Sequence, residues 1–175
     1  LLHDTMEDCG VTKADLAEQF GHHVAELVDG LTKLDKLRFS SRQENQAESF
    51  RKMLLAMAND VRVILIKLAD RSHNMRTMSD MKRDAQIRIA TETIEIYAPI
   101  ANRLGLDRTF RELENLSFKF LHPWRYEVLS KALERARSRR RHLLQEVLQN
   151  AENAFASAGL AGRFKAREKT VFSIY

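Results

Sequence analysis

Apolar residues recur at spacings of three and four along most of the chain, which is the period of an α-helix. The clearest stretch runs from His22 to Leu34, where Gly30 interrupts a stripe made of Val24, Leu27, Val28, Leu31 and Leu34. His22 and His23 follow a turn and lack nearby acids, so we expect them to be surface residues. The pattern predicts a helix here that buries one face.

The segment before this stripe has clear start and stop signals for a short helix. Thr12 is placed to cap Lys13–Phe20, with Asp15 at the third position of a capping box, and Gly21 is placed to end it. Further along, Ser40 and Ser41 are cap candidates for a helix through Ala58, whose core stripe is Phe50, Met53, Leu54 and Met57.

The run of residues 61–66 after Asn59 and Asp60 is ambiguous, because its β-branched residues fit a buried strand as well as a helix. The polar residues that follow favour the helix. They recur at spacings of three and four, which places them on one line of its surface: Lys67, Asp70, Asn74 and Thr77. We expect this helix to present its line of polar side chains to a binding partner or to another part of the protein.

The second half of the chain predicts longer helices. Pro99 stands where a helix begins or kinks, and residues 104–107 form a stop followed by a new cap. We expect one helix from Asp107 to Leu121 and another from Pro123 to about Ala158, ended by Gly159. Beyond it, the alternation over 161–167 is typical of an edge strand.

Composition agrees with a largely helical globular chain of 175 residues, since it has only two prolines and six glycines. No apolar run is long enough to cross a bilayer and no secretory leader is visible, so we expect a cytoplasmic protein without a membrane partner. Cys9 is the single cysteine, which excludes an intrachain disulfide and fits a reducing compartment. The first residue is Leu rather than Met, so we expect a fragment of a longer protein.

The net charge of +5 permits an anionic partner without choosing between nucleic acid, nucleotide and membrane surface. The basic residues gather in the last long helix, at Arg135, Arg137, Arg139, Arg140 and Arg141. Such a run is usually a solvated face, and no nucleic-acid reading module accompanies it. We therefore do not expect this chain to bind nucleic acid.

The candidate chemistry begins almost at the first residue, in the stretch from His3 to Asp8. Two leucines precede it, so we expect a helix already under way there, with His3, Asp4, Glu7 and Asp8 sharing one face. Three carboxylates on one face repel each other, and a divalent cation would compensate them. In that interpretation His3 and Asp4 bind the ion and Glu7 and Asp8 hold or deprotonate water. The alternative is an exposed acidic first turn that favours a helix N-terminus.

Asp70 is the natural third ligand, brought from a distant helix. The alternative is an ordinary ion pair with Lys67, Arg71 or Arg76. Asn74 either reads a base edge or bonds the backbone near a helix end.

Several segments in order resemble the hydrolase domain of the RelA/SpoT family, whose members make and destroy guanosine tetra- and pentaphosphate in the bacterial stringent response. They are LHDTMED (2–8), AELVDGLTKL (25–34), FRKMLLAM (50–57), RVILIKLADRSHNMRT (62–77), ETIEIYAP (92–99) and RLG (103–105). The resemblance implies an all-α HD-domain fold over 1–100, connecting helices over 101–158, and over 159–175 the first strand of an α/β nucleotidyltransferase-like synthetase domain.

The same resemblance assigns roles to individual residues. It implies a manganese ion held by His3, Asp4 and Asp70 with one further histidine upstream, where the family also has an arginine. Glu7 and Asp8 match the catalytic acidic pair, and Asn74 and Thr77 match positions that line the guanosine pocket. The implied reaction removes the 3′-diphosphate of the alarmone and gives GDP or GTP and pyrophosphate. Without the upstream residues, we expect a weak metal site in this chain.

The last residues resemble the opening of the family's synthetase domain, where Arg167, Lys169 and Ser173 match positions that contact the ATP phosphates. The Mg²⁺-binding acids of that domain are not in the chain. Thr170 stands where the family commonly has a histidine, which makes synthesis by the parent protein less secure. Asn102 replaces another histidine, outside the proposed metal site. Ribosomal or regulatory partners would act through C-terminal domains that lie outside this sequence.

Two alternatives stay open beside the hydrolase. One is a non-hydrolysing regulatory HD domain of a synthetase, a branch that has lost the acidic residues retained here. The other is an HD phosphohydrolase of another nucleotide, or a helical module that binds nucleic acid through the arginine run.

Overall fold

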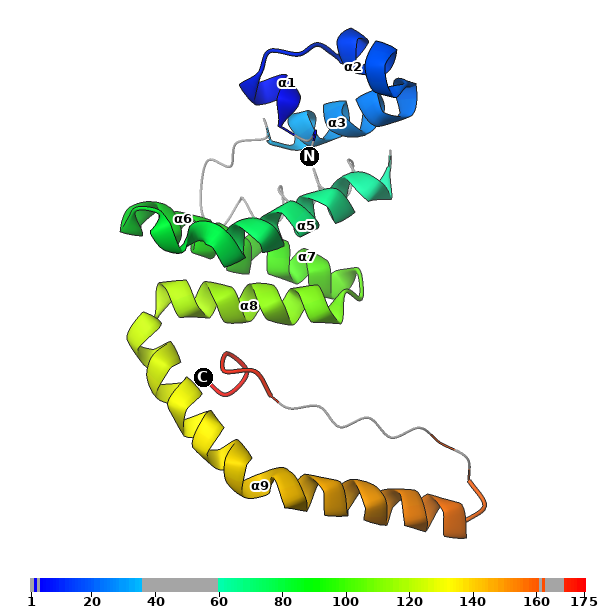
Figure 1. The fold of residues 1–175 in the computed structure, drawn as a ribbon, viewed down its shortest axis with the longest axis vertical. Helices are drawn as coiled ribbons and strands as arrows, with labels where there is room; N and C mark the ends of the chain where they lie inside the picture. The colour runs from blue at the N-terminus through cyan, green and yellow to red at the C-terminus, as the bar shows by residue number, and fades with distance from the viewer. Residues whose placement is uncertain (1, 3, 36–59, 161, 163–168) are drawn as a thin grey trace. The chain divides into compact units, whose positions relative to one another are not determined.

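The computed structural model describes residues 2, 4–35, 60–160, 162 and 169–175, with the side chains of 34–35 and 137–145 left aside. The chain divides into two compact units, Leu1–Ser117 and Phe118–Tyr175. All regular elements among these residues are helices, as Figure 1 shows. The all-α HD-type fold predicted from the sequence is confirmed.

The first three helices of the first unit form a small layer of their own. They are α1 (Thr5–Asp8), α2 (Lys13–Phe20) and α3 (His22–Asp35). The predicted capping box of α2 is present, because Thr12 accepts from the Asp15 amide while Asp15 accepts from the Thr12 amide. The buried core of this three-helix layer consists of Leu16, Ala25 and Val28.

One sequence expectation about this layer is wrong, because Leu2, which was expected in a helix already under way, is not helical. Leu2 lies outside any helix, and its carbonyl accepts hydrogen bonds from both the amide and the hydroxyl of Thr5. Asp4 is consequently the N-cap of α1 rather than a residue within a continuing helix. The acidic side chains of Glu7 and Asp8 follow within a single short turn.

Helix α5 (Val61–Thr77) packs against α3 and settles the ambiguity over residues 61–66 in favour of a helix. Asp60 caps it, and its side chain accepts from the Arg62 amide at 2.8 Å. Gly30 does not interrupt α3. A methyl group added at Gly30 would lie 2.9 Å from Cγ2 of Val63, so glycine allows the two helices to approach closely.

After η1 (Met78–Asp80), one helical run consists of α6 (Arg83–Glu92), the π-helical η2 (Thr93–Tyr97) and α7 (Ala98–Arg103). Pro99 lies in the first turn of α7, as the sequence predicts for a helix start. Proline has no N–H to donate and crowds the carbonyl four residues earlier, so the wider π-turn just before it accommodates the ring. Thr93 is fully buried in this turn, and its hydroxyl donates to the Ile89 carbonyl at 2.7 Å.

The remaining helices are α8 (Asp107–Leu121) and α9 (Pro123–Ser157), with bounds within a residue of those predicted. Within the second unit, the C-terminal turn packs its aromatic rings on Phe118, whose ring centroid lies 5.8 Å from that of Phe172 and 4.5 Å from that of Tyr175. None of the described helices is long and apolar enough to cross a membrane. The predicted helix over 40–58 and the predicted strand over 161–167 lie outside the described residues.

Candidate functional site

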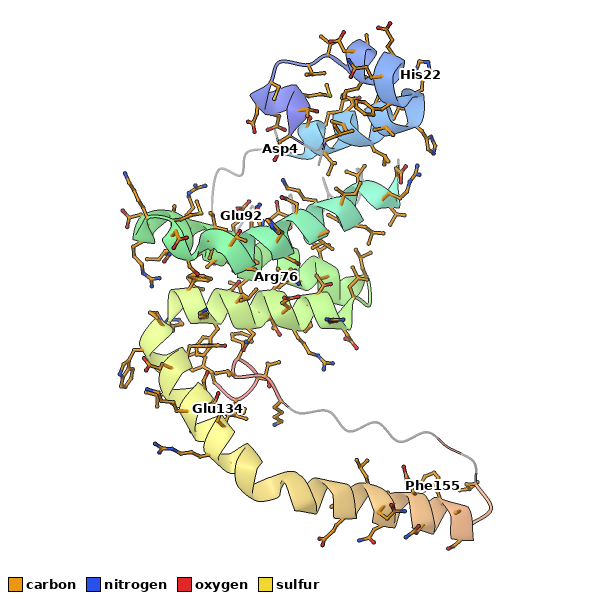
Figure 2. All side chains as sticks on the ribbon, viewed as in Figure 1. Asp4, His22, Arg76, Glu92, Glu134 and Phe155 are labelled. Atoms are coloured by element: carbon orange, nitrogen blue, oxygen red, sulfur yellow. The ribbon has the colours of Figure 1, made fainter. Side chains whose placement is uncertain are left out.

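The acidic cluster predicted from the sequence is divided between a cap and a helix. Asp4 is half-buried and its side chain makes no capping hydrogen bond, while Glu7 and Asp8 are exposed in α1. Figure 2 shows Asp4 at the start of α1, on the side of this layer that is turned toward α5 in that view. His3 lies outside the described residues. Glu7 and Asp8 are therefore in contact with solvent, whereas the Asp4 residue is partly desolvated.

Asp70 lies on α5 with only 13% of its side chain exposed. Its Oδ2 is 3.6 Å from Nζ of Lys67, and its Oδ1 accepts from Nδ2 of Asn74 at 3.1 Å. Of the three ion pairs considered from the sequence, the one with Lys67 is present. Arg71 and Arg76 have other carboxylate partners, because their side chains leave α5 in other directions.

The polar line along α5 runs from the interior to the surface. Lys67 is buried, Asp70 is half-buried, and Asn74 and Thr77 are exposed. Asn74 bonds a side chain rather than the backbone, whereas the Thr77 hydroxyl donates to the His73 carbonyl at 3.1 Å. The structure thus brings the proposed third metal ligand into direct contact with the first residue of the proposed guanosine pocket.

A buried charged layer lies behind this line, and the sequence reasoning missed it. The guanidinium of Arg71 stands 4.1 Å from the ring centroid of Tyr97, and its Nη1 is 3.1 Å from Oε2 of Glu92. Burial lowers the pKa of Arg71, but Tyr97 and Glu92 outweigh it and the net pKa is raised. Burial raises the pKa of Tyr97, so its phenol stays protonated. Tyr97 is at the end of the π-turn, a type of irregularity frequent at functional sites.

Arg76 joins α5 to α8 with a two-bonded contact to Glu112. Its Nε and Nη2 donate to the two carboxylate oxygens at 2.6 and 2.7 Å. Those hydrogen bonds hold the pKa of Glu112 below its ordinary value. Arg76 is placed between Asn74 and Thr77 in the sequence, so this contact fixes the end of α5 that carries both.

Helix α3 packs against both α1 and α5 and so links the acidic turn to the helix of Asp70. In the described part of the chain, which leaves out His3, no three His, Cys, Asp or Glu side chains are grouped so as to hold a metal ion. Asp70 nevertheless fits a ligating role, since a carboxylate held by hydrogen-bonding partners is typical of metal ligands.

The residues matched to ATP contacts lie in the second unit. Lys169 and Ser173 are exposed, and the Ser173 hydroxyl donates to the Thr170 carbonyl at 2.9 Å within the C-terminal turn. Arg167 lies outside the described residues. The turn alone shows no phosphate-binding arrangement, and this assignment stays a prediction.

Comparison with known proteins agrees with the resemblance seen in the sequence. Residues 1–107 match the HD domain family. The chain is 52% identical over all 175 residues to the guanosine-3′,5′-bis(diphosphate) 3′-pyrophosphohydrolase of Haemophilus influenzae, and covers 26% of that protein. It is 54% identical to the Vibrio cholerae protein of the same name, and 50% identical to the bifunctional (p)ppGpp synthase/hydrolase SpoT of Escherichia coli, covering 25% of each. The chain thus spans about a quarter of the length of the curated relatives it matches.

Proposed function

This chain belongs to the HD-domain family, and we propose that it carries the hydrolase centre of a larger protein that degrades guanosine 3′,5′-bis(diphosphate) and its pentaphosphate counterpart. The products would be GDP or GTP and pyrophosphate. The identity of 50–54% with relatives named for this activity extends over the whole chain. The structural observation that carries the proposal is the bond between Asn74 and the largely buried Asp70, which joins a metal-ligand candidate to a nucleoside-pocket candidate.

An HD-domain hydrolase implies a divalent metal ion, and we propose that the ion is manganese. The ligands would be His3, Asp4 and Asp70, with a further histidine upstream of this chain. Imidazole and carboxylate donors suit Mn²⁺, and the polar layer around Asp70 supplies the support that ligating carboxylates need. When bound, the ion would lower the pKa of water and offset negative charge on the phosphate oxygens.

Glu7 and Asp8 would handle the proton of the attacking water. Both carboxylates are exposed on α1 and follow Asp4 within one turn, so they could orient a water molecule near a metal ion bound by Asp4. The water oxygen forms a bond to the phosphorus attached to the ribose 3′ oxygen. The bond between that phosphorus and the 3′ oxygen breaks. The proton taken from water passes through the acidic pair to the departing 3′ oxygen.

Asn74 and Thr77 would hold the guanosine. Both are exposed near the end of α5, one and two turns beyond Asp70. A nucleoside bound there would present its 3′-diphosphate toward Asp70, because the polar line runs in that direction.

For the rest of the parent protein, we propose an activity, a location and partners from the same relatives. Arg167, Lys169 and Ser173 would contact ATP phosphates in a Mg²⁺-dependent synthetase domain, which would make the parent bifunctional. It would act in the cytoplasm, and ribosomal or regulatory partners would bind elsewhere in the parent protein.

The test is product identification with a protein that includes the residues upstream of Leu1. Guanosine tetraphosphate is incubated with Mn²⁺, and nucleotides and phosphates are separated. GDP and pyrophosphate in equal amounts are expected, and Glu7→Ala should abolish both while Glu18→Ala, an exposed acid on α2, should not. Inorganic phosphate instead of pyrophosphate would refute the proposed bond cleavage. If the correctly folded protein releases no product, the chain is a regulatory HD domain rather than a hydrolase.

A further inference from the structure

Lys67 is a buried lysine that the proposed mechanism does not use. Only 9% of its side chain is exposed, and it lies one helical turn before Asp70 on the same face of α5. Burying an ammonium group is costly unless an opposite charge compensates it. A lysine retained in this position therefore needs an explanation in terms of its neighbours.

The two oxygens of Asp70 are approached by different donors from the same helix. Lys67 lies at Oδ2 and Asn74 donates to Oδ1, at 3.6 and 3.1 Å. Because the donors sit one turn before and one turn after Asp70, they act on the carboxylate from opposite directions along the helix. Together the two contacts orient the plane of the carboxylate.

The distance at Oδ2 decides what kind of contact Lys67 makes. A separation of 3.6 Å exceeds the 2.7–3.2 Å range, roughly, of an N–H···O hydrogen bond. The ammonium thus attracts the carboxylate by charge without using a lone pair of Oδ2 in a short bond. A contact of this kind orients the carboxylate by charge rather than through a short hydrogen bond.

Lys67 lies close to the buried layer formed by Arg71, Tyr97 and Glu92. Its charge acts on the phenol of Tyr97, the residue that also stacks on Arg71. Arg71 is paired with Glu92 and Lys67 is paired with Asp70, so each of these two buried cations has a carboxylate partner. Only 9% of the Lys67 side chain is exposed, so its charge acts in a largely desolvated environment.

We propose that Lys67 is a positioning residue for Asp70, which holds that carboxylate in the orientation needed to bind a divalent cation. The inference rests on the proposed function, because it takes Asp70 to be a metal ligand. Lys67 acts on the ion only through Asp70. Groups that orient a ligating carboxylate typically change metal affinity by about 10–100-fold when removed.

The experiment measures Mn²⁺ affinity of the full-length protein without nucleotide, from the electron paramagnetic resonance signal of free Mn²⁺. Lys67→Met keeps the length of the side chain and removes the charge, and should weaken binding by about 10–100-fold. Lys67→Arg should recover most of the affinity, which a purely structural loss would not allow. The matched control is Lys33→Met, since Lys33 is an exposed lysine that likewise pairs with a carboxylate on its own helix, that of Asp29.

Two further variants keep the outcomes distinct. If Lys67→Met does not fold, as judged by circular dichroism, Lys67→Gln takes its place with the same expectation. Unchanged or tighter Mn²⁺ binding in the charge-removing variant would overturn the positioning role, and tighter binding would mean that Lys67 competes with the ion. Asp70→Ala separates the two claims, because Mn²⁺ binding that survives in it refutes the metal role of Asp70 itself.

Discussion

Gly30 on α3 lies close against Val63 on α5, and replacing it by alanine tests whether this contact holds the two helices of the site together. An added Cβ would lie 2.9 Å from Cγ2 of Val63 and 3.7 Å from its Cγ1. Val63 is 4% exposed and β-branched, so its side chain cannot rotate away freely. The helices must shift or the side chain must leave its preferred rotamer.

The expected magnitude follows from two opposing effects. Overpacking of this kind costs about 1–3 kcal/mol. Alanine is favoured over glycine inside a helix by about 1 kcal/mol. Gly30→Ala should therefore lower the free energy of unfolding by about 1 kcal/mol.

The companion variant Val63→Ala isolates the contact. Alone it removes two buried methyl groups and should cost about 2 kcal/mol. Combined with Gly30→Ala the clash disappears and the helix preference is gained, so the double variant should also lose only about 1 kcal/mol. The sum of the single changes is about 3 kcal/mol, which leaves a coupling of about 2 kcal/mol.

The assay is urea unfolding followed by far-UV circular dichroism. As a control, Gly30→Ala is combined with Val28→Ala, because Val28 packs with Leu16 and Ala25 in the α1–α3 layer. That pair should be additive. Additivity within about 0.5 kcal/mol for the Gly30 and Val63 pair would refute the close contact between α3 and α5.

Three further predictions concern single side chains of α5 and its cap. Hydrogen bonds from Arg62 lower the pKa of Asp60 from 3.8 to about 2, so the stabilisation from Asp60 is complete above pH 3.8 and is lost as pH falls toward 2. The difference in melting temperature between wild type and Asp60→Ala should therefore narrow over that window, and a constant difference would contradict the assignment. Arg71→Met should cost about 3 kcal/mol in urea unfolding, because Glu92 loses its buried partner, and a cost below about 1 kcal/mol would contradict that pairing. Arg76→Met, at an exposed pair, should lower the unfolding midpoint only slightly and less so at high salt; an effect that does not depend on salt would argue against an ionic contact.

Features set by neighbouring residues could be predicted from the sequence. The capping box of Thr12 and Asp15 depends on residues three apart, and the cap of α5 depends on Asp60 and the residues that follow it. The face shared by Lys67, Asp70 and Asn74 follows from helical geometry once a helix is assumed. The pairing of Asp70 was among the alternatives because its partner lies one turn away.

Features set by distant residues could not be predicted. Gly30 looks like a helix interruption until Val63 is seen beside it, and Arg76 has no visible reason to choose Glu112 on another helix. The stacking of Arg71 on Tyr97 depends on the π-turn, which local propensity does not reveal. The start of α1 was misplaced because an apolar residue such as Leu2 matches a helical pattern equally well when it lies outside a helix.

If Asp70 binds the metal ion, Mn²⁺-dependent release of pyrophosphate depends on its carboxylate. The measurement compares wild type with Asp70→Ala and with Asp84→Ala, an exposed acid in the first turn of α6, in the protein extended upstream of Leu1. We expect release from wild type and Asp84→Ala only when Mn²⁺ is present, and a loss of more than about 100-fold in Asp70→Ala. Equal release from wild type and Asp70→Ala would contradict the metal role of Asp70.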